Sequence, residues 1–224
     1  RVLFRSNPAI GVFQLAHVAG PGQVLQVILG FGFEQLGLHR QFLRGAGEEE
    51  VLPALVYYHG GGWVIGDLDT HDVVCRTLAN GARCAVFSVE YRKAPESPFP
   101  AAVDDCFAAL SHVVASSGAL KINAGRIAVG GDSAGGNLAA VCALMARDAG
   151  GPALSMQLLI YPATDQRMGH PSIEGNGEGY LLTKHSMRYF RGYYLPREAD
   201  WTDWRASPLL AKSLAGLPPA HVMT

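Results

Sequence analysis

Charge is what this sequence has least of. Only 17% of its 224 residues are charged, and the 18 basic and 19 acidic residues leave a formal net charge of −1. Surfaces that bind nucleic acid or an acidic membrane face carry an excess of basic residues, so we expect neither partner. Hydrophobic residues reach 49%. The chain can therefore bury enough apolar surface to fold, and most of it is not expected to be disordered.

Metal-binding and membrane-spanning patterns are also lacking. The four cysteines, Cys75, Cys84, Cys106 and Cys142, form no C-x-x-C pair and lie near no histidine at metal-ligand spacing. We expect buried thiols, no metal and no disulfide framework, as in a reducing cytoplasm. The opening residues do not resemble a signal peptide. The apolar run Leu15–Phe33 is broken by polar residues, proline and glycine, so no membrane span is expected there.

Short apolar runs alternate with amphipathic segments from about Val51 onward. This order predicts an α/β fold with a mostly parallel sheet and helices on both faces, in three layers. The first helix is expected to be capped by Asp69 and to bury Val73, Val74 and Leu78. The expected strands are Leu55–Tyr58, Ala85–Val89, Ile127–Gly130 and Ser155–Ile160, with a further strand entered at Pro219, and the expected helices are Asp69–Asn80, Pro100–Val114 and Gly135–Asp148.

Two segments depart from this alternation. Residues 1–50 are an atypical N-terminal segment, in which 1–44 show neither strand alternation nor a capped helix; it is either artefactual in part or a divergent cap. Its opening, Arg1–Ser6, resembles the translation of a sequencing adapter. Residues 51–224 form the core, with a cap-like insertion at about 166–205 that is polar and then rich in aromatic residues. A helix over Lys184–Tyr194 is expected there, and an ordinary peripheral helix pair is the alternative to a cap.

The clearest chemical motif is Gly131-Asp132-Ser133-Ala134-Gly135. It follows an expected strand and opens an expected helix, which is the context of a G-x-S-x-G nucleophile elbow. The serine of such an elbow lies on a strained turn and needs small neighbours. The helix N-terminus behind it offers unsatisfied N–H groups and a positive dipole end. Alone, the motif would be weak, because glycine-rich turns are common.

A second motif, His59-Gly60-Gly61-Gly62-Trp63, directly follows the first core strand. Consecutive glycines leave backbone N–H groups bare, and such groups can donate to the oxyanion of acyl transfer. A phosphate-cradling loop or a plain turn is the alternative. No Lys or Ser/Thr follows in P-loop fashion, and no G-x-G-x-x-G is present. The two motifs in this order therefore favour acyl transfer at a serine.

Six stretches of the sequence match one family: HGGGW at 59–63, GDLDTHD at 66–72, YR-x-APE-x-PFPAA at 91–102, GDSAGGNLA at 131–139, YP at 161–162 and GLPPA at 216–220. Through them the chain, over about Val51–Thr224, resembles the α/β-hydrolase fold and, within it, the hormone-sensitive-lipase-like (family IV) carboxylesterases. It departs from the family at Lys93, which is usually Leu, and at Ser97, which is usually His.

The resemblance implies a serine esterase that forms an acyl-enzyme and needs no cofactor. Ser133 matches the family's nucleophile, and Gly61, Gly62 and Ala134 match its oxyanion donors. The aromatic insertion resembles part of the family's substrate cap. The substrates implied are small-molecule esters with short to medium acyl chains. The residues expected to support these motifs structurally are His59, Gly60, Trp63, Gly131, Asp132 and Gly135.

Two members of a catalytic triad are missing from the sequence. In the family the acid follows the strand that GLPPA introduces and the histidine comes later, whereas this sequence ends at Thr224. We therefore expect a fold that is incomplete at its C-terminus and a chain that is inactive as given. Asp165 follows the wrong strand to be the acid. His170, His185 and His221 precede the expected position of the base.

Two other functions stay open at this stage. A non-catalytic relative that binds small molecules would keep the serine and the glycine loop but lack the histidine. An amide or formamide hydrolase would use the same machinery as an esterase. A homo-oligomer is also left open by the sequence.

Overall fold

The computed structural model describes residues 25–28, 39–44 and 50–224. In this part of the chain the strands form a seven-stranded sheet in the order β1-β2-β4-β3-β5-β6-β7. Strands β4, β3, β5, β6 and β7 run parallel, and β1 and β2 are antiparallel to their neighbours. The strands are β1 (Leu25–Ile28), β2 (His39–Arg44), β3 (Leu52–Tyr58), β4 (Ala85–Glu90), β5 (Ile122–Asp132), β6 (Met156–Ile160) and β7 (Ala220–Met223).

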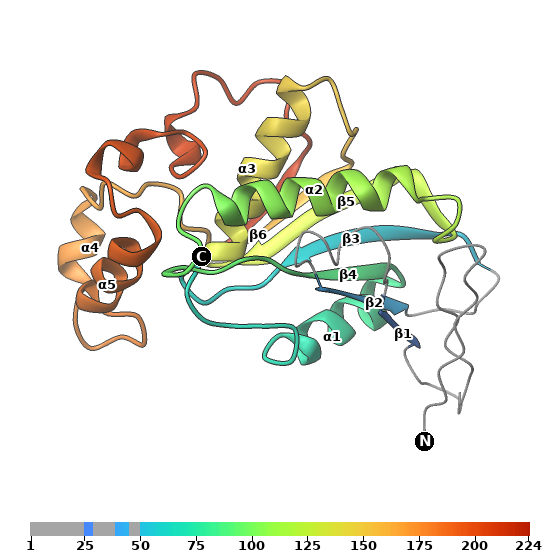
Figure 1. Cartoon of the computed structure of the whole chain (residues 1–224), viewed down its shortest axis with the longest axis horizontal. Coiled ribbons are helices and arrows are strands. Elements are labelled where there is room, and N and C mark those ends of the chain that lie inside the picture. The colour runs from blue at the N-terminus through green and yellow to red at the C-terminus, as the bar shows by residue number, and fades with distance from the viewer. Residues whose placement is uncertain (1–24, 29–38, 45–49) are drawn as a thin grey trace.

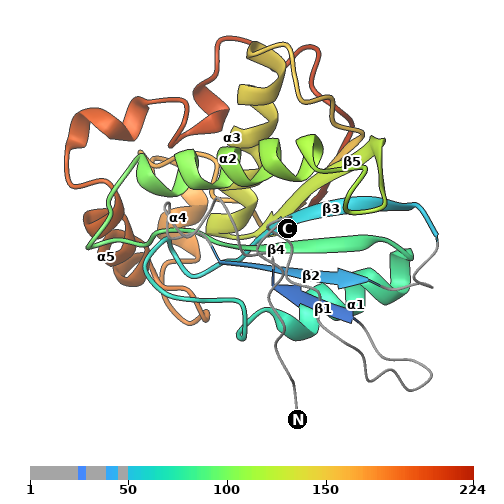
Figure 2. The same cartoon turned by 45° about the vertical axis from the view of Figure 1, so that its right-hand side comes forward.

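Helices cover both faces of this sheet. Helix α1 (Asp72–Ala82) lies on one face, and α2 (Ala101–Ala115) and α3 (Ala134–Asp148) lie on the other, as Figures 1 and 2 show. Alternate residues of β3 divide between the two sides: Val56 and Tyr58 join the larger core cluster, whereas Leu55 and Tyr57 join the cluster that contains α1 residues. The three-layer α/β architecture with a mostly parallel sheet is confirmed.

Most of the expected elements are present with shifted ends, but of the three residues expected on the apolar face of α1 only Leu78 packs against the core. The helix begins three residues after the expected cap Asp69, because a turn closed by side-chain hydrogen bonds precedes it. Val73 is 75% exposed and Val74 is 39% exposed, while Cys75 and Ala79 are fully buried. The helix thus approaches the sheet through its small side chains and turns the two valines outward.

The N-terminal segment also differs from the expectation. No strand is expected in residues 1–44, yet β1 and β2 lie there, and β2 pairs along its whole length with β4. The sequence of β2 has no clear apolar alternation. Backbone pairing with β4 therefore defines this strand, rather than an apolar pattern. Arg1–Ser6 and most of Leu15–Phe33 lie outside the described residues. None of the helices in the described ranges combines the length and apolar character needed to cross a bilayer.

Between β6 and β7 the chain forms an insertion beside one end of the sheet. Its helices α4 (Pro171–Gly175) and α5 (Lys184–Tyr194) lie side by side at the left of Figures 1 and 2. An ion pair between Glu174 and Lys184 joins the two helices. Helix α5 occupies the expected range. Two short 3-10 helices, Glu198–Thr202 and Pro208–Leu210, complete the return to β7.

Both ends of the insertion are fixed to α3 by one buried side chain. The Asn137 amide nitrogen donates to the Ala163 carbonyl oxygen at 2.6 Å and to the Ala206 carbonyl oxygen at 2.8 Å. Nearby, the Gln166 N–H donates to the Ser207 hydroxyl at 2.8 Å. Asn137 lies one helical turn after Ser133, so this clamp also sets the insertion next to the candidate site.

This clamp predicts a loss of stability on removal of the Asn137 side chain. In the Asn137→Ala variant, two carbonyl groups lose their donor, and we expect the free energy of unfolding in urea to fall by about 1–3 kcal/mol. The matched control is Asn176→Ala, an exposed asparagine at the end of α4, for which we expect a change within about 0.5 kcal/mol. Equal effects of the two variants would contradict the clamp.

Candidate active site

The strand order brings the two sequence motifs together. Strands β3 and β5 are parallel neighbours, and the last residues in register are Tyr58 and Gly131. The glycine loop begins at His59, directly after β3, and Ser133 directly follows β5. Both motifs therefore leave the sheet at the same edge, where the carboxyl ends of parallel strands commonly form a site.

Ser133 lies on a strained turn between β5 and α3. Its φ of 53° and ψ of −113° are costly for a residue with a side chain, by about 1–3 kcal/mol. Backbone hydrogen bonds hold this geometry. The Ser133 N–H donates to the Ile160 carbonyl oxygen at 2.9 Å. The Ser133 carbonyl oxygen accepts from the backbone N–H groups of Asn137 at 3.0 Å and Ala163 at 3.3 Å. Its hydroxyl forms no hydrogen bond within the described ranges. The backbone of the turn is thus hydrogen-bonded, whereas its serine hydroxyl is not.

Glycine is required on this turn because the turn packs directly on β3. A Cβ atom at Gly135 would collide with the carbonyl groups of Tyr58 and His59. A Cβ atom at Gly131 would collide with the carbonyl groups of Tyr58 and Gly135. The small residues of the motif therefore allow the start of α3 to rest on the end of β3, against the glycine loop.

Bare N–H groups occur on both loops. Gly61 has a φ of 117° and Gly62 a φ of 61°, and the Gly61 carbonyl accepts from Val64 at 3.1 Å and from Ile65 at 3.0 Å. Among the described residues, the N–H groups of Gly61, Gly62 and Ala134 donate to no acceptor. The Ala134 N–H belongs to the unsatisfied first turn of α3, at the positive end of the helix dipole.

Aromatic packing couples the glycine loop to the insertion. The indole of Trp63 stacks on the Tyr194 ring with centroids 4.4 Å apart and an interplanar angle of 3°. Phe99 meets Tyr194 edge-on at 5.8 Å. The Phe190 side chain occupies the space where a Cβ of Gly62 would lie. Helix α5 therefore rests directly on the loop.

His59 is placed to shape this loop rather than to exchange protons with solvent. Its side chain is fully buried and stacks on Tyr91 at 4.3 Å. Its Nδ1–H donates to the Gly60 carbonyl at 2.8 Å, and its own carbonyl accepts from the Tyr91 hydroxyl at 2.8 Å. Burial lowers the pKa of His59 to about 4. The ring is therefore neutral near pH 7.

Asp132 lies beneath the glycine loop and joins it to the serine turn. Its Oδ1 accepts from the Tyr57 hydroxyl at 2.8 Å and from the Gly60 N–H at 3.0 Å, and it lies 3.2 Å from His71 Nε2. Burial alone raises the pKa of Asp132, but hydrogen bonds from His71 and Tyr57 bring it below its ordinary value. The hydrogen bond to Asp132 raises the pKa of His71.

Sequence reasoning missed Tyr57, His71 and Phe190. His71 belongs to the GDLDTHD stretch that carries the resemblance, but the sequence alone assigned no role to it. Tyr57 follows from the period-2 alternation of β3, which turns it toward α1. Phe190 carries no sequence signal beyond the aromatic character of the insertion.

Asp165 and the three histidines that the sequence did not favour as triad members either form ion pairs or lie exposed on other elements. Asp165 pairs with Arg167 at 2.7 Å and with His170 at 3.4 Å. His185 is exposed on α5, and His221 is exposed on β7. None of these groups hydrogen-bonds to the serine hydroxyl. No cluster of three or more His, Cys, Asp or Glu side chains that could hold a metal occurs in the part of the chain that the structure describes.

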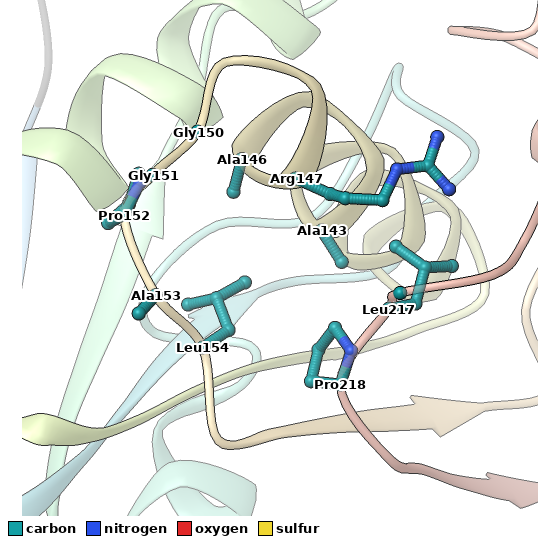
Figure 3. A pocket seen from close by; sticks show the side chains of 11 residues that line it. Ala143, Ala146, Arg147, Gly150, Gly151, Pro152, Ala153, Leu154, Leu217 and Pro218 are labelled. Atoms are coloured by element: carbon teal, nitrogen blue, oxygen red, sulfur yellow. The ribbon is translucent and has the colours of Figure 1, made fainter.

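A separate pocket of about 300 Å³ lies at the other end of α3 (Figure 3). A helix the length of α3 separates its two ends by about 20 Å. Arg147, the charged residue of this pocket, is held by the Ser213 and Ala215 carbonyl oxygens at 2.7 and 3.0 Å. Alanine, leucine and proline side chains make up much of the rest of the lining (Figure 3). The pocket offers no nucleophile and stands apart from the serine.

Several similar proteins are named as esterases. Carboxylic ester hydrolase LipN of Mycobacterium tuberculosis is 50% identical over 179 residues, which cover 76% of this chain and 47% of LipN. Carboxylesterase NlhH of the same species is 47% identical over 177 residues, covering 77% of this chain and 55% of NlhH. The chain thus spans about half the length of the curated relatives it matches.

Comparison with solved structures also finds an esterase. The hyperthermophilic esterase from the archaeon Pyrobaculum calidifontis superposes with a TM-score of 0.81 at 43% identity, covering 90% of this chain and 64% of that one. The Abhydrolase_3 family model, described as alpha/beta hydrolase fold, matches residues 55–224. This chain therefore belongs to the α/β-hydrolase family, in its hormone-sensitive-lipase-like branch.

Proposed function

We propose that this chain carries the nucleophile and the oxyanion hole of a serine carboxylic-ester hydrolase. The observation that carries the proposal is the juxtaposition set by the register of β3 and β5. A strained serine with an unbonded hydroxyl follows β5, the glycine loop follows the neighbouring β3, and the N–H groups of Gly61, Gly62 and Ala134 have no acceptor among the described residues. This is the arrangement that acyl transfer needs.

The reaction follows from these positions. The Ser133 oxygen attacks the ester carbonyl carbon, and a base takes the hydroxyl proton. The negative charge that develops on the carbonyl oxygen is stabilised by the N–H groups of Gly61, Gly62 and Ala134. Collapse of this intermediate breaks the bond to the alcohol, which leaves with the proton, and water then hydrolyses the acyl-enzyme. One such N–H donor contributes about 3–4 kcal/mol in sites of this kind.

The base and the acid that orients it are proposed to come from outside the 224 residues. Two observations support this. The Ser133 hydroxyl contacts no imidazole within the described ranges, and the chain spans about half the length of the curated relatives it matches. Asp165 is already committed to Arg167 and His170, which argues against its use as the acid.

Small-molecule esters with short to medium acyl chains are the proposed substrates. Phe190 contacts the glycine loop at Gly62, and Tyr189 and Tyr193 pack edge-to-face on the same helix. This aromatic surface beside the oxyanion donors would bind an acyl chain by apolar contact. A cytoplasmic location is also proposed. It is supported by the four cysteines, which are all buried and unpaired.

Replacing the nucleophile should abolish turnover. In the product of the complete reading frame, Ser133→Ala should lower kcat for p-nitrophenyl butyrate by more than about 10⁴-fold, because no other group can form the acyl-enzyme. The 224-residue chain should show no serine-dependent turnover, because no base contacts its serine in residues 25–28, 39–44 and 50–224. A side-by-side assay of the matching anilide separates ester from amide hydrolysis. Retention of turnover by Ser133→Ala would refute the proposal.

Substituting the second proposed oxyanion glycine should damage catalysis more than folding. Gly62→Ala places a Cβ at a φ of 61° and against Phe190, which shifts the N–H group. We expect kcat/KM to fall by about 10²–10³-fold. Gly81→Ala is the matched control, because a Cβ there meets nothing within 4 Å; it should keep full activity and stabilise α1 by about 0.5–1 kcal/mol. Normal kcat/KM in Gly62→Ala would exclude this glycine from the oxyanion hole.

A further inference from the structure

One carboxylate links the nucleophile to the oxyanion loop. Asp132 immediately precedes Ser133, and its Oδ1 accepts from the Gly60 N–H at 3.0 Å, while Gly60 immediately precedes the proposed oxyanion donors. The contact is close, because a Cβ at Gly60 would collide with this carboxylate. Any rotation of the Asp132 side chain would therefore move the loop relative to the serine.

Two further side chains fix the direction of that carboxylate. The Tyr57 hydroxyl on β3 donates to Oδ1 at 2.8 Å, and His71, the N-cap residue of α1, places Nε2 at 3.2 Å from the same oxygen. Only 17% of the His71 side chain and 13% of the Asp132 side chain are exposed. The pair is therefore shielded from the screening that weakens surface ion pairs.

The neighbouring hydrogen bonds determine the charge of His71. The Thr70 hydroxyl donates to the Asp67 carbonyl at 2.9 Å, so toward His71 Nδ1, 3.0 Å away, it can only accept. Nδ1 is therefore protonated, and Nε2 must also carry a proton because it faces a carboxylate. The Gly60 nitrogen lies 3.3 Å from Nε2, but a protonated Nε2 cannot accept, so the Gly60 hydrogen goes to Asp132. The imidazolium satisfies every bond in the cluster.

We propose that His71 is a positioning residue: as an imidazolium paired with Asp132, it keeps that carboxylate bonded to Gly60 and thereby holds the glycine loop in register with Ser133. The proposal rests on the proposed esterase function. A buried ion pair as a whole adds little net stability, although removal of one partner leaves the other charge uncompensated, and a misplacement of about 1 Å in a catalytic site can cost about 10²-fold in rate. The effect of the pair is therefore expected in kcat.

The pair exists in a defined pH window. The other titratable groups that interact with this pair are Asp67, Tyr57, Cys75, His59, Tyr91 and Tyr161. The pKa of His71 is raised. The stabilisation that the protonated imidazole gives to the ion pair is therefore present at lower pH and is lost as pH rises through that raised value. The pKa of Asp132 is lowered. The stabilisation that its ionised carboxylate gives to the ion pair is therefore lost only as pH falls through that lowered value. Activity should therefore have an alkaline limb set by His71.

The test uses the product of the complete reading frame, with active sites counted by titration with a p-nitrophenyl phosphonate. His71→Gln retains a donor but no charge. We expect its kcat for p-nitrophenyl butyrate to fall by about 10–100-fold with little change in KM, and its alkaline limb to disappear. The control Arg76→Gln removes an ion pair with Asp72 on the same helix and should leave the rate and the pH profile unchanged.

A second variant keeps the test decisive if His71→Gln does not fold. Thr70 is exposed, and Thr70→Val removes the acceptor of the Nδ1 proton, so the alkaline limb should move to lower pH. The proposal is overturned if His71→Gln keeps the wild-type kcat per titrated site and its alkaline limb, or if Thr70→Val leaves the limb in place. Activity retained in Ser133→Ala would instead refute the esterase function itself.

Discussion

The site depends on the contact between the end of β3 and the start of α3. Tyr58 and Gly131 close the register of β3 and β5, and Gly135 rests on the Tyr58 and His59 carbonyl groups. No side chain larger than hydrogen fits between them. Because the strands end together, the glycine loop and the serine turn begin together. Backbone packing thus places the bare N–H groups on the same side of the sheet as Ser133, the proposed nucleophile.

The strain of the serine turn is offset by its surroundings. Ile160 and Ala163 bind the peptide groups of Ser133 from the side of β6, and Asp132 ties the same turn to Gly60. Such a network over-determines a backbone conformation that would otherwise relax. Helix α5 adds a further constraint through the stack of Tyr194 on Trp63. Pre-organised N–H donors need not reorganise as charge develops, which is the basis of their catalytic effect.

Hydrophobic alternation was enough to predict strands β3 to β7 and helices α2, α3 and α5, and the matching motif stretches carried the resemblance to the family. The places of Val73 and Val74 on the apolar face of α1 were wrong, because the helix packs on the sheet through Cys75 and Ala79, with Leu78 beside them. Strands β1 and β2 were missed, because backbone pairing can define a strand without an apolar pattern. The roles of Tyr57 and His71 depend on three-dimensional neighbours of Asp132, which are remote in sequence and leave no local pattern.

The most direct test of the central claim is a crystal structure of the full-length protein after reaction with a p-nitrophenyl phosphonate. The phosphorus should be bonded to Ser133 Oγ. One phosphonyl oxygen should lie about 2.7–3.1 Å from the backbone nitrogens of Gly61, Gly62 and Ala134. An adduct on another residue, or a phosphonyl oxygen turned away from these three nitrogens, would contradict the account.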